Sequence, residues 1–137
     1  MLEHQCEIRV RYQETDAMGV VYHGNYFIWF EIARISMLDA LGMPYRQLEA
    51  EGYLLPVLEI HAKFQKPCYF DDRVQVTCRI IEPPRLKIRI EYEVNKGGIL
   101  CSTGCSQHVF TTPQGKAIKP PELFMDSLRR QMNGYSS

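Results

Sequence analysis

The sequence predicts an α+β fold in which a curved antiparallel sheet of five strands wraps around one long central helix. Residues 26–41 are apolar or aromatic around most of a helical circumference, and a helix of this kind is enclosed by other elements. From Val57 onward the hydrophobic period changes from about 3.6 residues to about 2, which is typical of consecutive strands. Because no other segment is long and apolar enough to cover the apolar face of such a sheet, we expect the sheet to enclose the helix. The polar residues of the helix are Glu31, Arg34, Ser36 and Asp39.

The elements around the long helix follow from local signals. Residues 5–12 alternate between apolar and polar side chains, so a first strand is expected there. Gly42 stands where a helix C-cap glycine belongs, and Pro44 and Gly52 mark the two ends of a short second helix. The residues expected on the inner face of the first strand are Cys6, Ile8, Val10 and Tyr12.

Four further strands are expected, each ended by proline, aspartate or glycine residues typical of turns. The residues from Ser102 to Ser106 are small, and small residues in a strand often mark the close approach of another backbone or of a ligand.

Residues 120–132 predict a short amphipathic helix, with frayed residues after it. We expect a single domain over residues 1–137. The four strands are expected over residues 57–65, 73–80, 86–94 and 99–111, and the inward residues of the last helix are expected to be Leu123, Phe124 and Leu128.

The composition is that of an ordinary soluble protein. Sixteen basic residues balance sixteen acidic ones, so no charged field indicates binding to nucleic acid. The polar, alternating N-terminus does not resemble a signal peptide, and no apolar run is long enough for a membrane span. An odd number of cysteines, five, without a CxxC motif indicates neither a disulfide framework nor a metal site. A cytoplasmic location is therefore expected.

The loop before the long helix is the candidate for chemistry. Asp16 lies in an Asp-Ala-Met-Gly turn, and the helix is expected to start near Gly24 or Asn25. The first N–H groups of a helix have no partner within it and carry about half a positive charge. They can hold an oxygen atom that becomes negative in a reaction, and their field favours an ionised carboxylate nearby. This spacing alone leaves two roles open for Asp16, a turn or capping role and a catalytic role in acyl transfer to water.

The other titratable residues give weaker signals. His23 is open to a packing role as well as to a catalytic one. His61 and His108 lie on expected strands, and neither is expected to pair with a cysteine or a serine. Glu31 is expected to pair with Arg34, three residues further along the helix. The sequence contains no nucleophile elbow, P-loop or dinucleotide-binding motif.

The segment from Val10 to Tyr26, VRYQETDAMGVVYHGNY, resembles the signature of the hotdog-fold acyl-CoA thioesterases, in the branch of 4-hydroxybenzoyl-CoA thioesterase and YbgC. The later segment KPCYFDD, residues 66–72, resembles the proline-and-acidic turn of that branch, and the resemblance extends from Cys6 to about Thr112. It implies the fold that the hydrophobic periods predict, and it implies hydrolysis of an acyl-CoA thioester to a free acid and CoA.

The resemblance also implies roles for individual residues. Asp16 matches the aspartate that attacks the thioester carbonyl or activates the attacking water, and both routes stay open. The backbone N–H of His23 matches the donor to the carbonyl oxygen. Residues expected near the substrate are Tyr22, Gly24, Tyr26 and Trp29. In such proteins lysine and arginine side chains meet the CoA phosphates, and the candidates, each equally open to a role on a solvated surface, are Lys63, Lys66, Arg85, Lys87 and Arg89.

The family further implies a homodimer or homotetramer with active sites between subunits. The expected partner is an acyl-CoA or the thioester of an acyl carrier protein. No metal or redox cofactor is expected, because a thioester is already activated. Met18 and Glu14 depart from the residues that many members carry, which bears on the pocket mouth and the turn.

Two other functions are consistent with the fold. A non-catalytic module that binds acyl thioesters is one, although an intact Asp16 argues against it. A hydratase or dehydratase of enoyl- and hydroxyacyl-CoA is the other, although its longer acid-and-histidine motif is missing. The acyl group stays open between aryl and aliphatic, with a slight preference for aryl from the aromatic residues of the loop and helix.

Overall fold

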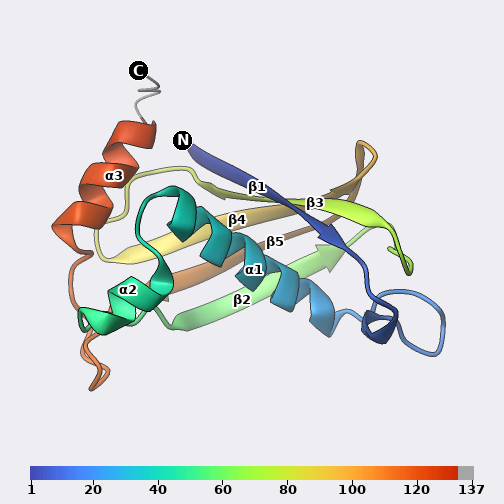
Figure 1. Ribbon diagram of the computed structural model, residues 1–137, viewed down its shortest axis with the longest axis horizontal. Helices are drawn as coiled ribbons and strands as arrows, with labels where there is room; N and C mark the ends of the chain where they lie inside the picture. Colours follow the sequence, from blue (N-terminus) through green and yellow to red (C-terminus); the bar gives the residue numbers. More distant parts are fainter. Residues whose placement is uncertain (133–137) are drawn as a thin grey trace.

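The structure is a computed structural model, and it describes residues 1–132. One long helix lies across one face of a five-stranded sheet, and two shorter helices lie near one end of it (Figure 1). This arrangement confirms the predicted fold. The elements are β1 (Leu2–Arg9), a 3₁₀ turn (Tyr12–Glu14), α1 (Gly24–Ala40), α2 (Tyr45–Ala50), β2 (Val57–Phe64), β3 (Arg73–Ile80), β4 (Lys87–Lys96), β5 (Ile99–Val109) and α3 (Glu122–Met132).

All strand pairs in the sheet are antiparallel, and the spatial order is β1-β3-β4-β5-β2. β2 therefore lies at an edge, where it pairs with β5 on one side and with no other strand of the described chain. The inward residues of β3 and β4 alternate as predicted, and Val76, Cys78 and Ile90 are almost completely buried. The sheet thus provides one apolar face and one polar face, and α1 covers the apolar one.

α1 packs on this face through large aromatic side chains. Trp29 and Phe30 are fully buried, and the Phe30 ring stacks on Tyr92 of β4 with ring centroids 4.3 Å apart. A Cβ atom on Gly104 of β5 would lie 2.5 Å from Cε2 of Phe30 and 2.8 Å from the carbonyl oxygen of His61. Close approach at the run of small residues is confirmed, and the approaching groups are the Phe30 ring and the neighbouring strand.

Local signals placed the helix ends correctly. Gly42 follows α1 with φ +80°, a conformation that costs glycine little. Its N–H donates to the backbone carbonyl of Asp39 at 3.0 Å. Pro44 stands at the N-cap of α2. No helix within residues 1–132 is long and apolar enough to cross a membrane.

Two expectations about inward residues are wrong. Tyr12 was expected on the inner face of the first strand, but β1 ends at Arg9 and the side chain of Tyr12 is 77% exposed in the 3₁₀ turn. Leu123 was expected to face inward, but it is 57% exposed because Phe124 and Leu128, four residues apart, form the buried face of α3. The frayed tail that was expected lies in residues 133–137, outside the described residues.

Candidate active site

Asp16 lies in a tight turn that holds one of its carboxylate oxygens and leaves the other open. Its Oδ1 accepts the N–H of Met18 at 2.9 Å, and its backbone carbonyl accepts the N–H of Gly19 at 2.9 Å. The turn is closed by the N–H of Asp16, which donates to the carbonyl of Val20 at 2.9 Å. Within the described residues, Oδ2 of Asp16 accepts no hydrogen bond from protein. The turn role and an accessible carboxylate are thus present together.

Glu14 joins this loop to the long helix. Its side chain is 4% exposed, and its Oε2 accepts the indole N–H of Trp29 at 2.9 Å, while Oε1 accepts the N–H of Arg11 at 2.8 Å. The backbone carbonyl of Glu14 accepts two more bonds, from the N–H of Tyr22 at 2.9 Å and from the side-chain amide of Asn25 at 2.8 Å. From the sequence, Glu14 was expected only to depart from the residues that many family members carry. The available signal was the tryptophan on a buried helix, since its N–H needs an acceptor.

The start of α1 carries free backbone donors next to this loop. His23 is the N-cap residue, and its side chain makes no capping hydrogen bond. From His23 onward, Asn25 is the first residue whose N–H reaches a backbone carbonyl, that of Tyr22 at 2.9 Å. Among the described residues, no acceptor is recorded for the N–H groups of His23 and Gly24. Such donors at the positive end of a helix can hold a developing negative charge.

Asp16 and His23 line the same cleft, which has a volume of about 340 Å³. Its walls come from the Asp16 loop, from the start of α1 and from the segment after β2. Tyr26 and Phe64 form an aromatic wall with ring centroids 5.0 Å apart, and burial raises the pKa of Tyr26, so this phenol stays neutral. Lys66 brings one positive charge to the cleft. An open carboxylate, free N–H donors and an apolar wall can bind a carbonyl compound and activate water or attack directly.

The other residues predicted near the substrate lie at different depths. Tyr22 is exposed, and its ring centroid lies 4.2 Å from that of His23. Gly24 lies next to the same ring, because a Cβ atom added to Gly24 would lie 3.0 Å from Cε2 of Tyr22. Trp29 is fully buried and does not line the cleft.

The five basic residues predicted to meet CoA are not gathered at one place. Lys66 lines the cleft, whereas Lys63 and Arg89 line a hollow on the polar face of the sheet. Arg85 and Lys87 lie with Arg89 in another hollow, beside the turn before β4.

Three expectations about side-chain pairs are wrong. Glu31 and Arg34, both described, form no ion pair, because Arg34 donates to the hydroxyl of Tyr92 at 3.2 Å instead. His61 lies 2.8 Å from Sγ of Cys105, through its Nε2, and Nε2 of His108 lies 2.7 Å from Oγ of Ser106. His61 and Cys105 are opposite each other on β2 and β5, so this contact depends on a strand register that the sequence did not reveal.

Within residues 1–132, no group of three or more histidine, cysteine, aspartate or glutamate side chains is placed to hold a metal ion. All five cysteines are free thiols.

Comparison with known proteins places the chain in a family. The sequence model of the thioesterase-like superfamily matches residues 10–128. YneP of Bacillus subtilis, provisionally named an acyl-CoA thioesterase, is 36% identical over 122 residues, which cover 88% of each chain. The 1,4-dihydroxy-2-naphthoyl-CoA hydrolase of Thermosynechococcus vestitus is 34% identical over 105 residues, 73% of this chain and 70% of that protein.

Solved structures agree with the sequence matches. The crystal structure of a DHNA-CoA thioesterase from Staphylococcus aureus has a TM-score of 0.88 and 30% identity, and it covers 98% of this chain and 96% of its own. The fold, the family and the enzyme class predicted from the sequence are confirmed. The chain belongs to the thioesterase-like superfamily, has the hotdog fold and is a thioester hydrolase.

Proposed function

We propose that this protein hydrolyses an acyl-CoA thioester to a free acid and CoA, with Asp16 as the catalytic carboxylate and the backbone N–H of His23 as the donor to the carbonyl oxygen. The observation that carries the proposal is that Asp16, with one carboxylate oxygen open, and the uncapped start of α1 line one cleft. Membership of a thioesterase family supports the thioester as the bond that is cleaved.

Two routes use this geometry. In the first, the carboxylate attacks the carbonyl carbon, the C–S bond breaks, CoA leaves as the thiolate, and water hydrolyses the mixed anhydride to restore the carboxylate. In the second, the carboxylate takes a proton from a water molecule whose oxygen attacks the carbonyl carbon, and CoA leaves as the thiolate. In both routes the carbonyl oxygen becomes negative, and the N–H of His23 stabilises that charge.

The CoA part would extend from the cleft past Lys66, which is our candidate for a phosphate contact. Lys63 and Arg89 on the polar sheet face are further candidates, although Arg89 already pairs with Glu91 at 3.3 Å. The contact between these basic side chains and the CoA phosphates is therefore expected to weaken as ionic strength rises, as contacts between exposed charges do.

We extend the proposal to a homodimer formed along β2. The unpaired edge of β2 exposes Val57, Leu58 and Phe64, and a row of exposed isoleucines follows α1 beside it. An unpaired strand edge with exposed apolar side chains is a template for pairing with another strand, and a second copy supplies an identical one. The exposed isoleucines are Ile28, Ile32 and Ile35.

The experiment is a panel of aryl-, short-chain and long-chain acyl-CoA thioesters, with the free acid quantified by chromatography so that the five protein thiols do not interfere. Hydrolysis of any member at an enzymatic rate supports the proposal. Tight binding without release of acid would favour the non-catalytic binding module, and addition of water to an enoyl-CoA without thioester cleavage would favour the hydratase. Light scattering of the same preparation measures the oligomeric state.

A further inference from the structure

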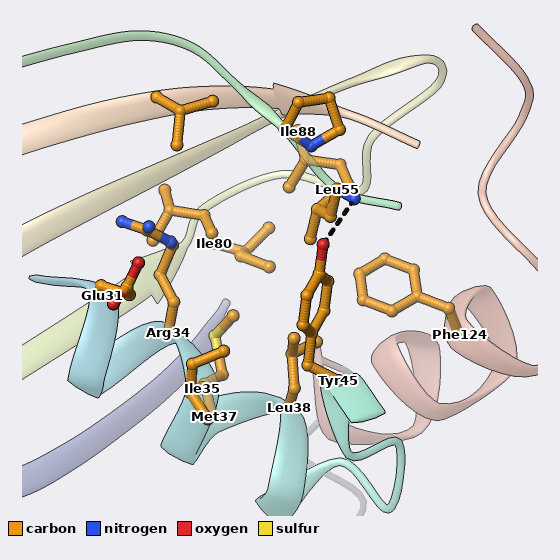
Figure 2. Close-up of a pocket in the computed structure, with 13 residues that line it drawn as sticks. Glu31, Arg34, Ile35, Met37, Leu38, Tyr45, Leu55, Ile80, Ile88 and Phe124 are labelled. Atoms are coloured by element: carbon orange, nitrogen blue, oxygen red, sulfur yellow. Dashed lines mark hydrogen bonds between the residues drawn. The ribbon is translucent and has the colours of Figure 1, made fainter. Parts of the chain in front are cut away.

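Three residues with reactive or charged side chains form a row across the polar face of the sheet. His61 of β2 stands opposite Cys105 of β5, and Cys105 stands opposite Glu91 of β4. A hollow of about 180 Å³ lies over this row, and its seven lining residues all come from these three strands. The hollow shares no lining residue with the cleft around Asp16, nor with the apolar cavity between α1 and the opposite face of the sheet, which Figure 2 shows.

Cys105 points away from α1. The next residue before it, Gly104, faces the Phe30 ring of α1, and successive side chains of a strand point to opposite faces. The thiol of Cys105 is therefore on the polar face, where the side chain of His61 meets it from the neighbouring strand.

Cys105 and His61 form a thiol–imidazole pair. Nε2 of His61 lies 2.8 Å from Sγ of Cys105, within hydrogen-bond distance. One nitrogen of a neutral imidazole is an acceptor, so Nε2 in that role can take the thiol proton. The thiolate is the nucleophilic form of cysteine, and an adjacent imidazolium stabilises it. The pair thus contains the nucleophile and the base that cysteine chemistry requires.

Two positive charges lie beside this pair. Lys63 and Arg89 line the same hollow, and both side chains are exposed. Glu91 is the one acidic residue among the seven, and Arg89 offsets its charge by pairing with it at 3.3 Å. A hollow lined by two cations, an imidazole and one paired carboxylate attracts a small anionic molecule.

The thiol is covered by side chains that can move. Cys105 is 3% exposed, but His61, Lys63 and Arg89 around the hollow are exposed. Exposed side chains change rotamer within nanoseconds, whereas disulfide exchange takes seconds or longer. Access to Sγ is therefore expected without unfolding of the strands.

The other four cysteines are in less reactive surroundings. In the described chain, the hydrogen bond from an imidazole to a cysteine is found at Cys105 alone. Burial raises the pKa of Cys68 to about 11 and that of Cys78 to about 12, and it also raises the pKa of Cys6. Cys101 is fully buried. A reagent that reacts with thiolates should therefore select Cys105.

We propose that Cys105 is a nucleophilic thiol that forms a mixed disulfide with an anionic low-molecular-weight disulfide, and that His61 is its general base. Lys63 and Arg89 bind the negative charges of that molecule. This modification site is separate from the Asp16 cleft, and it does not depend on the proposed hydrolysis of thioesters.

The reaction is a thiol–disulfide exchange. His61 takes the proton of Cys105, and Sγ attacks one sulfur atom of the small disulfide. The Sγ–S bond forms as the S–S bond breaks, and the other half leaves as a thiolate that takes the proton back from His61. Cys105 is oxidised and the small disulfide is reduced, so no further oxidant is needed.

The first test follows the native wild type at pH 7 with an excess of oxidised glutathione, an anionic disulfide. Peptide mapping by mass spectrometry measures the mixed disulfide at each of the five cysteines over time, in buffer and in urea. An ordinary cysteine is a few per cent thiolate at pH 7, so native Cys105 should react about 10-fold or more faster than each of the others. In urea the five rates should become similar. No adduct at native Cys105, or an adduct at Cys6 that forms as fast, would overturn the proposal.

The second test assigns the base. His61→Gln should lower the rate at Cys105 about 10-fold at pH 7, whereas the control His4→Gln, on β1 and bonded to Ser36, should not. At pH 10 thiols lose their protons to the solvent, so His61→Gln and the wild type should react equally fast. Equal rates at pH 7 would remove His61 from the reaction, and a difference that persists at pH 10 would show that it only shapes the hollow.

The third test identifies the charge of the molecule. The ratio of the rate with oxidised glutathione to the rate with cystamine, a cationic disulfide, should fall about 10-fold at low salt in Lys63→Met/Arg89→Met, since exposed charge contacts contribute up to about 5-fold each. The control Lys116→Met/Arg130→Met removes two exposed cations elsewhere and should keep the wild-type ratio. A ratio that is unchanged in Lys63→Met/Arg89→Met would overturn the anionic class. All three tests measure protein mass, so their outcomes do not depend on thioester hydrolysis.

Discussion

The indole N–H of Trp29 donates to Oε2 of Glu14 at 2.9 Å, and this bond ties the buried face of α1 to the loop that carries Asp16. Asp16 follows Glu14 by two positions in the sequence, so the position of the proposed catalytic carboxylate relative to the helix start is expected to depend on this contact. Glu14 is thus a positioning residue, and its effect on the reaction is expected to be indirect.

Replacing Glu14 by alanine should lower both stability and activity. The substitution leaves the N–H groups of Trp29 and Arg11 without their acceptor, which costs about 1–3 kcal/mol of unfolding free energy for buried groups. Urea unfolding measures the loss, and acyl-CoA hydrolysis at a temperature where the variant is folded measures the effect on kcat. Glu49→Ala, at an exposed position on α2, should change the unfolding free energy by less than about 0.5 kcal/mol. Equal stability of the two variants would show that the Glu14 contacts do not hold the loop.

Gly104→Ala should destabilise the protein, because the added Cβ would lie 2.5 Å from the Phe30 ring and 2.8 Å from a backbone oxygen. Overpacking of this kind costs about 1–3 kcal/mol. Thr103→Ala, one residue earlier on the same strand, adds no atom and serves as the control in thermal unfolding. A Gly104→Ala variant as stable as the wild type would mean that α1 packs less closely on β5 than the structure shows.

The protein should be less stable at acidic pH because of His108. The pKa of His108 is lowered from 6.5 to about 4 by burial and by Arg34, so between these values the unfolded chain binds a proton that the folded chain does not. The unfolding free energy should therefore fall as the pH drops from about 6.5 to about 4, by roughly 3 kcal/mol at most from this group. His108→Asn removes the titration, so urea unfolding over this pH range should show a shallower decline than the wild type. Parallel curves would show that His108 is protonated in the folded state.

Lys66→Met should raise the KM for acyl-CoA by about 2- to 5-fold at low salt, with kcat little changed, since an exposed charge contact contributes up to about 1 kcal/mol. The difference from the wild type should shrink as salt is added, because ions screen exposed charges. Lys116→Met, exposed and remote in sequence from the cleft residues, is the matched control. A KM that is unaffected at low salt would remove Lys66 from the CoA contacts.

Hydrophobic period and turn residues were sufficient to predict the fold, because burial on one face constrains residue type at each second position of a strand and along the buried side of α1. They did not predict the pairs that hold the sites. The bond between Glu14 and Trp29 joins a turn to a helix, and the contact of His61 with Cys105 needs the register of β2 on β5. Arg34 was expected to bind Glu31 because the two are three residues apart, but a hydroxyl on β4 lies within reach on the buried side. Tertiary contacts overrode the local preference at each of these places.

The most direct test of the central claim is the rate of acyl-CoA hydrolysis by Asp16→Asn beside the wild type. Asparagine keeps the Oδ1 acceptor for the N–H of Met18, so the turn is retained while the charge and the nucleophilic or basic oxygen are lost. Asp39→Asn, at an exposed position on α1, is the control and should retain wild-type activity. We predict that Asp16→Asn loses about 100-fold or more in kcat with the best substrate of the panel, the size typical of a lost catalytic group. A folded Asp16→Asn variant that hydrolyses this substrate at the wild-type rate would contradict the account.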